Sequence, residues 1–165
     1  MKDAKAGTSS ADIVARQPSV GTIGGGSLNR SLGYAVRKAQ IYAYQQYAAV
    51  MQEFEVRPVQ YALLMLIHEH PAMPQSAAGI ELCIEKGNLT GLLRELEERG
   101  LTTRKNSSTD RRAHTLHLTA RGTTLIRKVM KRHDRYEEAL AAKVGPDGHA
   151  LLLSLLHQLV SDSTT

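Results

Sequence analysis

The sequence predicts a mainly α protein with one small β-hairpin. Three observations carry this prediction. Apolar residues recur at steps of three and four along most of the chain, prolines and glycines interrupt these runs, and only two short segments alternate as strands do. The 165 residues suffice for one domain that buries a core without disulfides or a structural metal.

The first part of the chain is expected to hold an arm and two helices. Residues 1–27 are rich in Gly, Ser, Thr and Ala and lack apolar periodicity, which predicts a flexible arm. Apolar residues then recur at helical spacing over 28–57, which predicts one long helix. Pro58 ends this helix because it pushes the preceding residue out of the helical region, and it suits the first turn of a second helix over 58–70.

A pair of short helices and a hairpin follow. Helices are expected over about 75–82 and 86–99, and Gly100 stands where a C-terminal cap belongs. The segments LTTRK and AHTLHL then alternate in character and flank the polar stretch NSSTDRR. Two short strands around so long a loop predict a hairpin whose tip projects.

The end of the chain is expected to form two more helices. Thr119 is a suitable N-cap for a helix over 120–144, and Gly145-Pro146 ends that helix before a last one over 147–161. The last helix carries five leucines at helical spacing, namely Leu151, Leu152, Leu155, Leu156 and Leu159. An apolar face of this size predicts a partner, most simply a second copy of the chain.

The order of the elements and the placement of charge favour a nucleic-acid partner. Helix, helix, helix-turn-helix and hairpin is the order of a winged helix-turn-helix domain, here with helices added at both ends. The chain carries a formal net charge of +5. Seven basic and four acidic residues fall within 86–112, so 7 − 4 gives +3. More than half of the excess therefore lies where a DNA duplex would lie.

The stretch GLLRELEERGLTTRKNSSTDRRAHTLHLTARGTTLI resembles the MarR family of transcriptional regulators. It is similar to that family's recognition helix, Asp-x-Arg wing and Leu-Thr-x-x-Gly start of the fifth helix, and the helix order extends the resemblance over about 28–161. The resemblance implies a homodimer that binds a pseudopalindromic operator in double-stranded DNA. It divides the chain into a flexible N-terminal arm (1–27), a first dimerisation helix (28–57), a winged helix-turn-helix DNA-binding lobe (58–118) and C-terminal dimerisation helices (119–165).

The wing motif carries the first set of expected DNA contacts. In the family, the arginine of Asp-x-Arg enters the minor groove and the aspartate orients the wing, which implies these roles for Arg112 and Asp110. Arg111 stands beside them for a phosphate contact. A narrow A·T-rich minor groove is strongly negative and attracts arginine. The alternative is a solvated turn that holds an ion pair.

The recognition helix carries the second set. Lys86 is expected to contact phosphate, while Asn88 and Thr90 can reach base edges. Asn88 serves equally well as a helix cap, so both interpretations stay open. Gly91 departs from the family pattern, which often has arginine or another long polar residue there, and Arg94 one turn later is the side chain that would take over its contacts.

The resemblance also implies a ligand cleft between the first, second and fifth helices. Its candidate residues are Tyr34, Arg37, Lys38, Ile41, Tyr42 and Tyr44 on the first helix, Tyr61, Met65 and His68 on the second, and Arg127 and Met130 on the fifth. Aromatic walls with a few cations suit a small aromatic acid or its coenzyme A (CoA) thioester as effector. The alternative is that the tyrosines belong to the core and the subunit interface. The expected function is a sequence-specific repressor that such an effector releases from DNA.

Other classes of function find little support in the sequence. No nucleophile elbow, His-Glu-x-x-His motif or phosphate-binding loop is present, so an enzyme is not expected. No metal or other cofactor is expected, because His68-Glu69-His70 and His114-x-x-His117 lack a full ligand set. No run is long and apolar enough for a membrane span and the start lacks a signal peptide, which predicts the cytoplasm.

Two alternative functions remain open. Cys83 lies between Leu82 and Ile84, which favours an inert core cysteine over a redox-switched regulator that works through this thiol. A winged-helix module that binds an acidic protein surface instead of DNA would use the same hairpin. Absence of duplex binding at low salt would favour that module.

Overall fold

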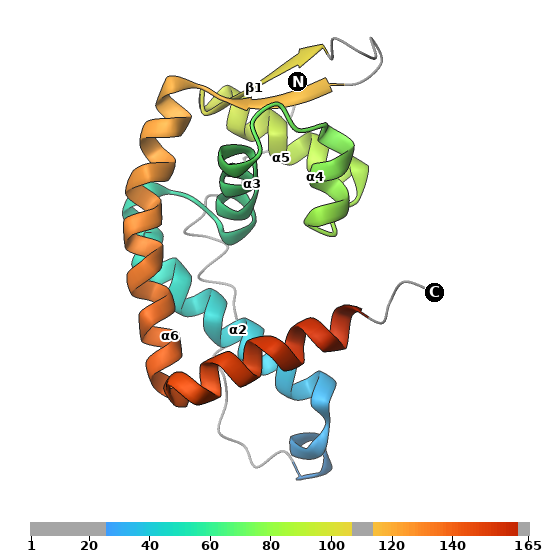
Figure 1. Ribbon diagram of the computed structural model, residues 1–165, viewed down its shortest axis with the longest axis vertical. Helices are drawn as coiled ribbons and strands as arrows, with labels where there is room; N and C mark the ends of the chain where they lie inside the picture. Colours follow the sequence, from blue (N-terminus) through green and yellow to red (C-terminus); the bar gives the residue numbers. More distant parts are fainter. Residues whose placement is uncertain (1–25, 107–113, 162–165) are drawn as a thin grey trace, which may run out of the picture.

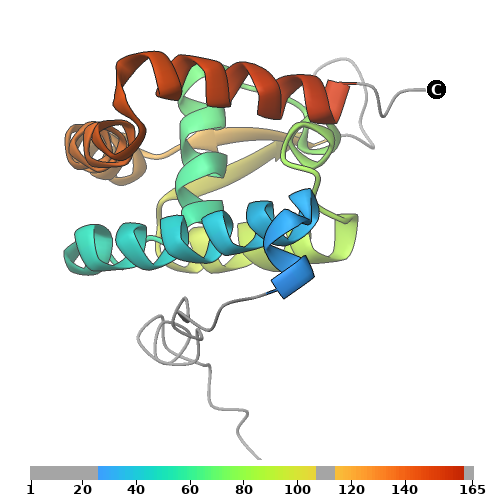
Figure 2. The same cartoon turned by 90° about the horizontal axis from the view of Figure 1, so that it is seen from below.

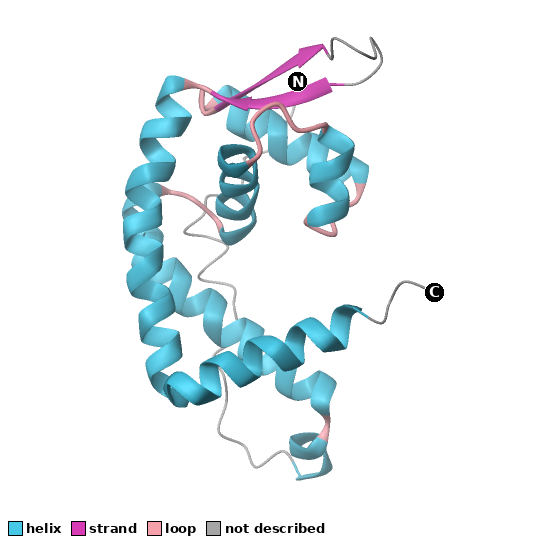
Figure 3. Ribbon diagram, in the orientation of Figure 1, coloured by secondary structure: helices cyan, strands magenta, loops and turns pink. Residues whose placement is uncertain are grey.

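The computed structural model describes residues 26–106 and 114–161, and Figure 1 gives their arrangement. The elements are η1 (Gly26–Arg30), α2 (Leu32–Met51), η2 (Gln52–Phe54), α3 (Pro58–Glu69), α4 (Gln75–Glu81), α5 (Lys86–Glu98), β1 (Thr102–Asn106), β2 (His114–Leu118) and α6 (Ala120–Ser161). Helices α3, α4 and α5 and the hairpin gather at one end of the molecule (Figures 1 and 3), and we call them the winged lobe. Helix α2 and the last part of α6 lie at the opposite end of the molecule (Figure 2).

The first long helix is shorter than the sequence predicts, and most of the predicted arm (1–27) lies outside the described residues. The Ser31 side chain accepts a hydrogen bond from the Tyr34 backbone N–H at 3.4 Å, so α2 begins at Leu32 and residues 26–30 form a separate 3₁₀ turn. At the other end Glu55 takes a left-handed conformation, with φ of 50°. One helix over 28–57 is therefore wrong at both ends, because a serine cap and a left-handed residue interrupt it.

Helix α3 begins and ends where the sequence predicts. Pro58 is its first residue, and the Gln60 side chain accepts a hydrogen bond from the Arg57 backbone N–H at 3.0 Å. Leu63, Leu64 and Ile67 are almost fully buried. The helix is thus the centre of the winged lobe, as its nearly continuous apolar sequence predicts.

Helices α4 and α5 form the helix-turn-helix, and the hairpin closes over it. Gly100 has φ of 66° and donates its N–H to the Glu97 carbonyl at 2.8 Å, which confirms the predicted C-cap. Strands β1 and β2 pair antiparallel, with Arg104 opposite Leu116. The Leu116 N–H donates to the Met73 carbonyl at 2.9 Å, so the wing is tied to the link before α4.

Helix α6 is two helices with a sharp break, as the sequence predicts. The Thr119 side chain accepts a hydrogen bond from the Gly122 N–H at 3.0 Å and caps the start. Gly145 has φ of 75° and ψ of 165°, and Pro146 follows it. The last helix leaves a row of apolar side chains exposed in the single chain, namely Leu151, Leu152, Leu153, Leu155, Leu156, Leu159 and Val160.

Two buried clusters hold the fold, and α6 contributes to both. Ile126 packs into the core of the winged lobe with residues of α3, α4, α5 and the hairpin. Val129 and Tyr136 pack with Tyr47 and Met51 of α2 in a second cluster. Helix α6 is therefore the element that joins the winged lobe to α2.

The start of α6 approaches the backbone before β1 closely. A Cβ built on Gly122 lies 2.0 Å from the Leu101 carbonyl oxygen, whereas a Cβ on Gly91 meets no atom within 4 Å. We therefore expect Gly122→Ala to lower the free energy of unfolding by about 3 kcal/mol or more, because a backbone atom must move. Gly91→Ala is the matched control and should raise it by up to about 1 kcal/mol, because alanine favours the helix. Chemical denaturation of both variants measures the difference, and equal stabilities would contradict the close approach.

Candidate nucleic-acid interface and ligand site

Helix α5 has one buried and one exposed face. The core side of α5 consists of Leu89, Leu92, Leu93 and Leu96. The four residues of α5 that are expected to contact DNA are all exposed, namely Lys86, Asn88, Thr90 and Arg94. The Thr90 hydroxyl donates to the Lys86 carbonyl at 2.8 Å, and Arg94 pairs with Glu98 at 3.2 Å. Exposed pairs of this kind are weak, so both side chains can exchange these partners for a ligand.

The capping interpretation of Asn88 is wrong. The N-cap position of α5 belongs to Glu85, and Asn88 lies in the first turn of the helix. Its exposed amide is therefore available to a partner outside the chain.

The positive charge counted in the sequence is only partly available on the surface. Arg104 donates to Glu97 from Nε at 2.9 Å and from a terminal nitrogen at 2.6 Å. Arg99 donates to the backbone carbonyls of Glu55 and Phe54 at 2.8 and 3.3 Å. The guanidinium groups of these two arginines are therefore bound within the chain, whereas Lys86 and Lys105 remain exposed. Asp110, Arg111 and Arg112 of the predicted wing tip lie outside the described residues.

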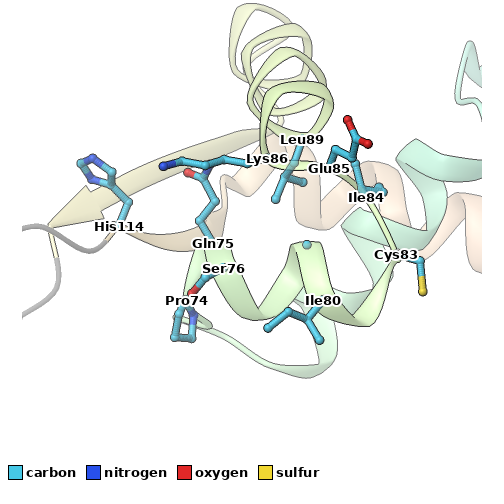
Figure 4. A pocket seen from close by; sticks show the side chains of 11 residues that line it. Pro74, Gln75, Ser76, Ile80, Cys83, Ile84, Glu85, Lys86, Leu89 and His114 are labelled. Atoms are coloured by element: carbon cyan, nitrogen blue, oxygen red, sulfur yellow. The ribbon is translucent and has the colours of Figure 1, made fainter. Parts of the chain in front are cut away.

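A groove of about 910 Å³ runs between α4 and the start of α5 (Figure 4). Its lining residues are Pro74, Gln75, Ser76, Gly79, Ile80, Cys83, Ile84, Glu85, Lys86, Leu89 and His114. Cys83 is exposed and has φ of 51°, so the prediction of a core cysteine is wrong. The left-handed turn between the two helices directs this side chain outward, and the buried Leu89 fills the core nearby.

An aromatic cluster joins α2, α3 and α6, and we define it as Tyr47, Tyr61, His133 and Tyr136. The His133 ring stacks on Tyr61, with centroids 4.2 Å apart, and Tyr47 meets Tyr136 edge-on at 5.6 Å. The Tyr136 hydroxyl donates to the Ala43 carbonyl at 3.2 Å. The Tyr47 hydroxyl is buried and has no hydrogen-bond partner among the described residues. An unpaired buried hydroxyl is costly, so this position favours a ligand or a water molecule as partner.

Burial disfavours every charged form in this cluster. It raises the pKa of Tyr61 to about 12, with the nearby carboxylates Asp134, Glu137 and Glu69 adding to the shift. It also raises the pKa of Tyr47. Burial lowers the pKa of His133, although Glu137 and Asp134 oppose the change. The rings are thus neutral, and the charges around Tyr61 are negative.

The residues predicted for the ligand cleft are only partly gathered in the structure. Tyr61, Met65 and Met130 are half-buried against the core of the winged lobe. On α2, Lys38 Nζ lies 5.7 Å from the centre of the Tyr34 ring. Arg37 and Arg127 are exposed, while Ile41, Tyr44 and His68 are half-buried.

The cleft prediction missed Tyr47 and His133, whose rings contact Tyr61, and Tyr136, whose ring contacts both of them. The signal was present in the sequence, since His133 and Tyr136 lie three residues apart on the inward face of α6.

In residues 26–106 and 114–161, no three His, Cys, Asp or Glu side chains gather as ligands for a metal ion. No helix in those residues is long and apolar enough to cross a membrane.

Comparison with known proteins decides the family. The sequence model of the MarR family matches residues 56–114. The chain is 31% identical over 142 residues to a putative transcriptional regulatory protein for the hcr operon of Thauera aromatica, covering 85% of this chain and 86% of that protein. The chain belongs to the MarR family. This MarR-family protein is a transcriptional regulator, and the prediction of a regulator rather than an enzyme is confirmed.

Solved structures of the transcriptional repressor CouR confirm the winged helix-turn-helix fold. CouR bound to a 23-mer DNA duplex is 31% identical, with a TM-score of 0.79 over 84% of this chain and 99% of that one. CouR bound to p-coumaroyl-CoA is 28% identical, with a TM-score of 0.78 over 84% and 98%. The helices at both ends of this MarR-family protein therefore belong to the shared fold.

The lowered pKa of His133 makes the stability of the fold depend on pH. The unfolded chain binds a proton at this side chain more readily than the folded chain does, so stability should fall as the pH drops below about 6.5. We expect the melting temperature to fall less between pH 7.5 and pH 5.5 in His133→Gln than in the wild type. His70→Gln, at an exposed histidine, is the matched control and should behave as the wild type does. An equal loss in wild type and His133→Gln would contradict a lowered pKa at the half-buried His133.

Proposed function

We propose that this MarR-family regulator is a homodimeric repressor that binds a specific double-stranded DNA operator and is released by a small aromatic acid or its CoA thioester. The observation that carries the proposal is the two-faced helix α5, which buries four leucines and exposes Lys86, Asn88, Thr90 and Arg94. The similarity to CouR on a DNA duplex supports it. The location that follows from a DNA target is the cytoplasm.

The exposed face of α5 would enter the major groove, where each side chain has a chemical role. The Asn88 side-chain amide can donate through its NH2 group to adenine N7 and accept through its oxygen from adenine N6, and Thr90 can bond a base edge or touch a thymine methyl group. Lys86 at the start of the helix would contact phosphate, and Arg94 would extend the contact surface. On the family resemblance, Arg112 enters the minor groove, Asp110 orients the wing and Arg111 contacts phosphate.

The homodimer is proposed on the uncovered apolar face of the last helix. Seven apolar side chains over 151–160 are exposed in the single chain. Leu28, Leu32 and Val36 at the start of the first helical segment are exposed as well. A second copy would cover such a surface and place two recognition helices about one DNA turn apart. This assigns the dimerisation role to 28–57 and 119–165 and the DNA-binding role to 58–118.

The effector is proposed to bind beside the aromatic cluster, between α2, α3 and α6. The unpaired Tyr47 hydroxyl and the Tyr61–His133 stack offer a hydrogen bond and a ring surface. The carboxylates of Asp134, Glu137 and Glu69 add to the raised pKa of Tyr61, so the neutral ring of the effector should face the cluster and its acid or thioester end should face away. Arg37, Lys38 and Arg127 are the cations proposed for that end. CouR binds p-coumaroyl-CoA, which supports a thioester.

The DNA-binding proposal predicts a specific loss in Arg112→Ala. The full-length protein should bind a duplex selected from a random library with an affinity that falls steeply with salt. Arg112→Ala should bind less tightly, and the slope of its log affinity against log salt concentration should be smaller by about one unit for each cation removed from the DNA. Lys143→Ala on α6 is the control and should bind as the wild type does. Fluorescence anisotropy measures both quantities. Wild-type affinity in Arg112→Ala would refute the wing assignment, and absence of any duplex binding at low salt would favour the protein-interaction module.

The effector proposal predicts a rise in melting temperature with the right ligand. The panel contains p-coumaroyl-CoA, p-coumarate and their benzoyl counterparts, and a compound that binds the folded state should stabilise it by mass action. Tyr61→Leu should reduce the shift, whereas Phe54→Leu, outside the aromatic cluster, should retain it. A flat panel, or equal shifts in both variants, would contradict a site at the cluster.

The exposure of Cys83 favours a second candidate function, a regulator switched by oxidation. The thiol lies in the turn before the recognition helix, where a bulky or charged product would stand beside DNA. Peroxide treatment should then weaken duplex binding in the wild type but not in Cys83→Ser. Equal affinities before and after treatment would exclude the switch.

A further inference from the structure

Polar side chains from three elements meet at one end of the groove between α4 and α5. Gln75 and Ser76 lie in the first turn of α4, Lys86 is the first residue of α5, and His114 is the first residue of β2. In Figure 4 the ends of Gln75 and Lys86 point toward one another, on the side of the groove where His114 lies. The Glu85 carboxylate points away from them (Figure 4). This end of the groove is therefore polar, and Glu85 is the one acidic residue among the described residues that line the groove.

The four side chains share one chemical property, which is that each can donate hydrogen bonds. Lysine has three donors and no acceptor, the glutamine amide has two donors, and serine and histidine have at least one each. None of them forms a side-chain hydrogen bond or ion pair with another residue in the described parts of the chain. A group of unused donors around a cation is suited to an anion with several acceptor oxygens.

The surrounding surface suits a macromolecular anion better than a small one. Gly87 and Gly91 follow Lys86 along the exposed face of α5, and a Cβ built on either glycine meets no atom within 4 Å. Neither residue is demanded by packing, although glycine costs up to about 1 kcal/mol inside a helix. A bare helix surface permits close approach of a large partner. In helix-turn-helix proteins the first helix crosses the DNA backbone while the second enters the groove.

We propose that Gln75, Ser76, Lys86 and His114 together hold one backbone phosphate of the DNA, with the phosphate seated at the polar end of the groove. This inference rests on the proposed DNA-binding function and adds three contacts from α4 and β2 to it. Because the contacts come from α4, from the recognition helix α5 and from strand β2 of the wing, one bound phosphate would fix the positions of all three elements relative to the DNA. Such contacts position the protein and carry no base specificity.

The test compares two duplexes at several salt concentrations, using the full-length protein. One duplex is selected from a random library and the other is of mixed sequence without the selected site. Ser76→Ala and Gln75→Ala should weaken binding to both duplexes by the same factor, on the order of tenfold, because each removes a hydrogen bond to a charged group. The salt slope should not change, since neither residue carries a charge. Lys86→Ala should lower the slope by about one unit per protomer.

Controls separate a lost contact from a lost fold. Thr124→Ala and Gln52→Ala, at exposed positions outside the groove, should bind both duplexes as the wild type does, and all variants should melt at the wild-type temperature. His114→Gln, which keeps a donor, should bind more tightly than His114→Ala. Wild-type affinity in Ser76→Ala and Gln75→Ala would overturn the proposed phosphate-binding site while leaving the proposed function intact. A loss of affinity confined to the selected duplex would also overturn the proposed site, because it would mean that these side chains contact base edges instead of phosphate. If the wild type binds neither duplex, both proposals fall.

Discussion

One helix packs against both hydrophobic cores, and the rest of the structure depends on that packing. The first half of α6 buries Ile126 in the winged lobe, and Val129 and Tyr136 in the cluster at α2. Its first turn lies so close to the Leu101 backbone that only glycine fits at position 122. Close-packed contacts of this kind transmit displacement instead of absorbing it. The winged lobe therefore cannot rotate relative to α2 without disturbing α6.

The aromatic cluster lies at this same joint, which gives a physical route from ligand to DNA under the proposed function. Tyr61 comes from the winged lobe, Tyr47 from α2, and His133 and Tyr136 from α6. A ligand that inserts a ring here would favour whichever arrangement of the three helices accommodates it. In a dimer, a small rotation of each winged lobe changes the distance between two recognition helices. Operator binding is sensitive to that distance because half-sites are spaced by the DNA turn.

Local chemistry determined which parts of this structure could be predicted from the sequence. Pro58, Gly100, Thr119 and Gly145 mark element boundaries that the structure confirms, because proline, glycine and capping residues act on their own neighbourhood. The split of the first helix was missed, because its ends are set by the Ser31 cap and the left-handed Glu55.

Long-range pairing determined what could not be predicted at the candidate site. The outward turn of Cys83 follows from a backbone angle that periodicity does not reveal. Arg99 and Arg104 count as positive charge in the sequence but are bound within the fold. The ring contacts of Tyr61 join residues far apart in the chain, so the family resemblance indicated the right three helices and helical spacing did not identify the right partners.

In the proposed homodimer, two copies of this chain place two recognition helices on one face of a duplex. Hydroxyl-radical footprinting of the full-length protein on its selected duplex tests this claim most directly. We expect two protected patches related by a two-fold axis, with centres about 10 base pairs or a multiple of that distance apart. A single patch, or two patches without that symmetry and spacing, would contradict it.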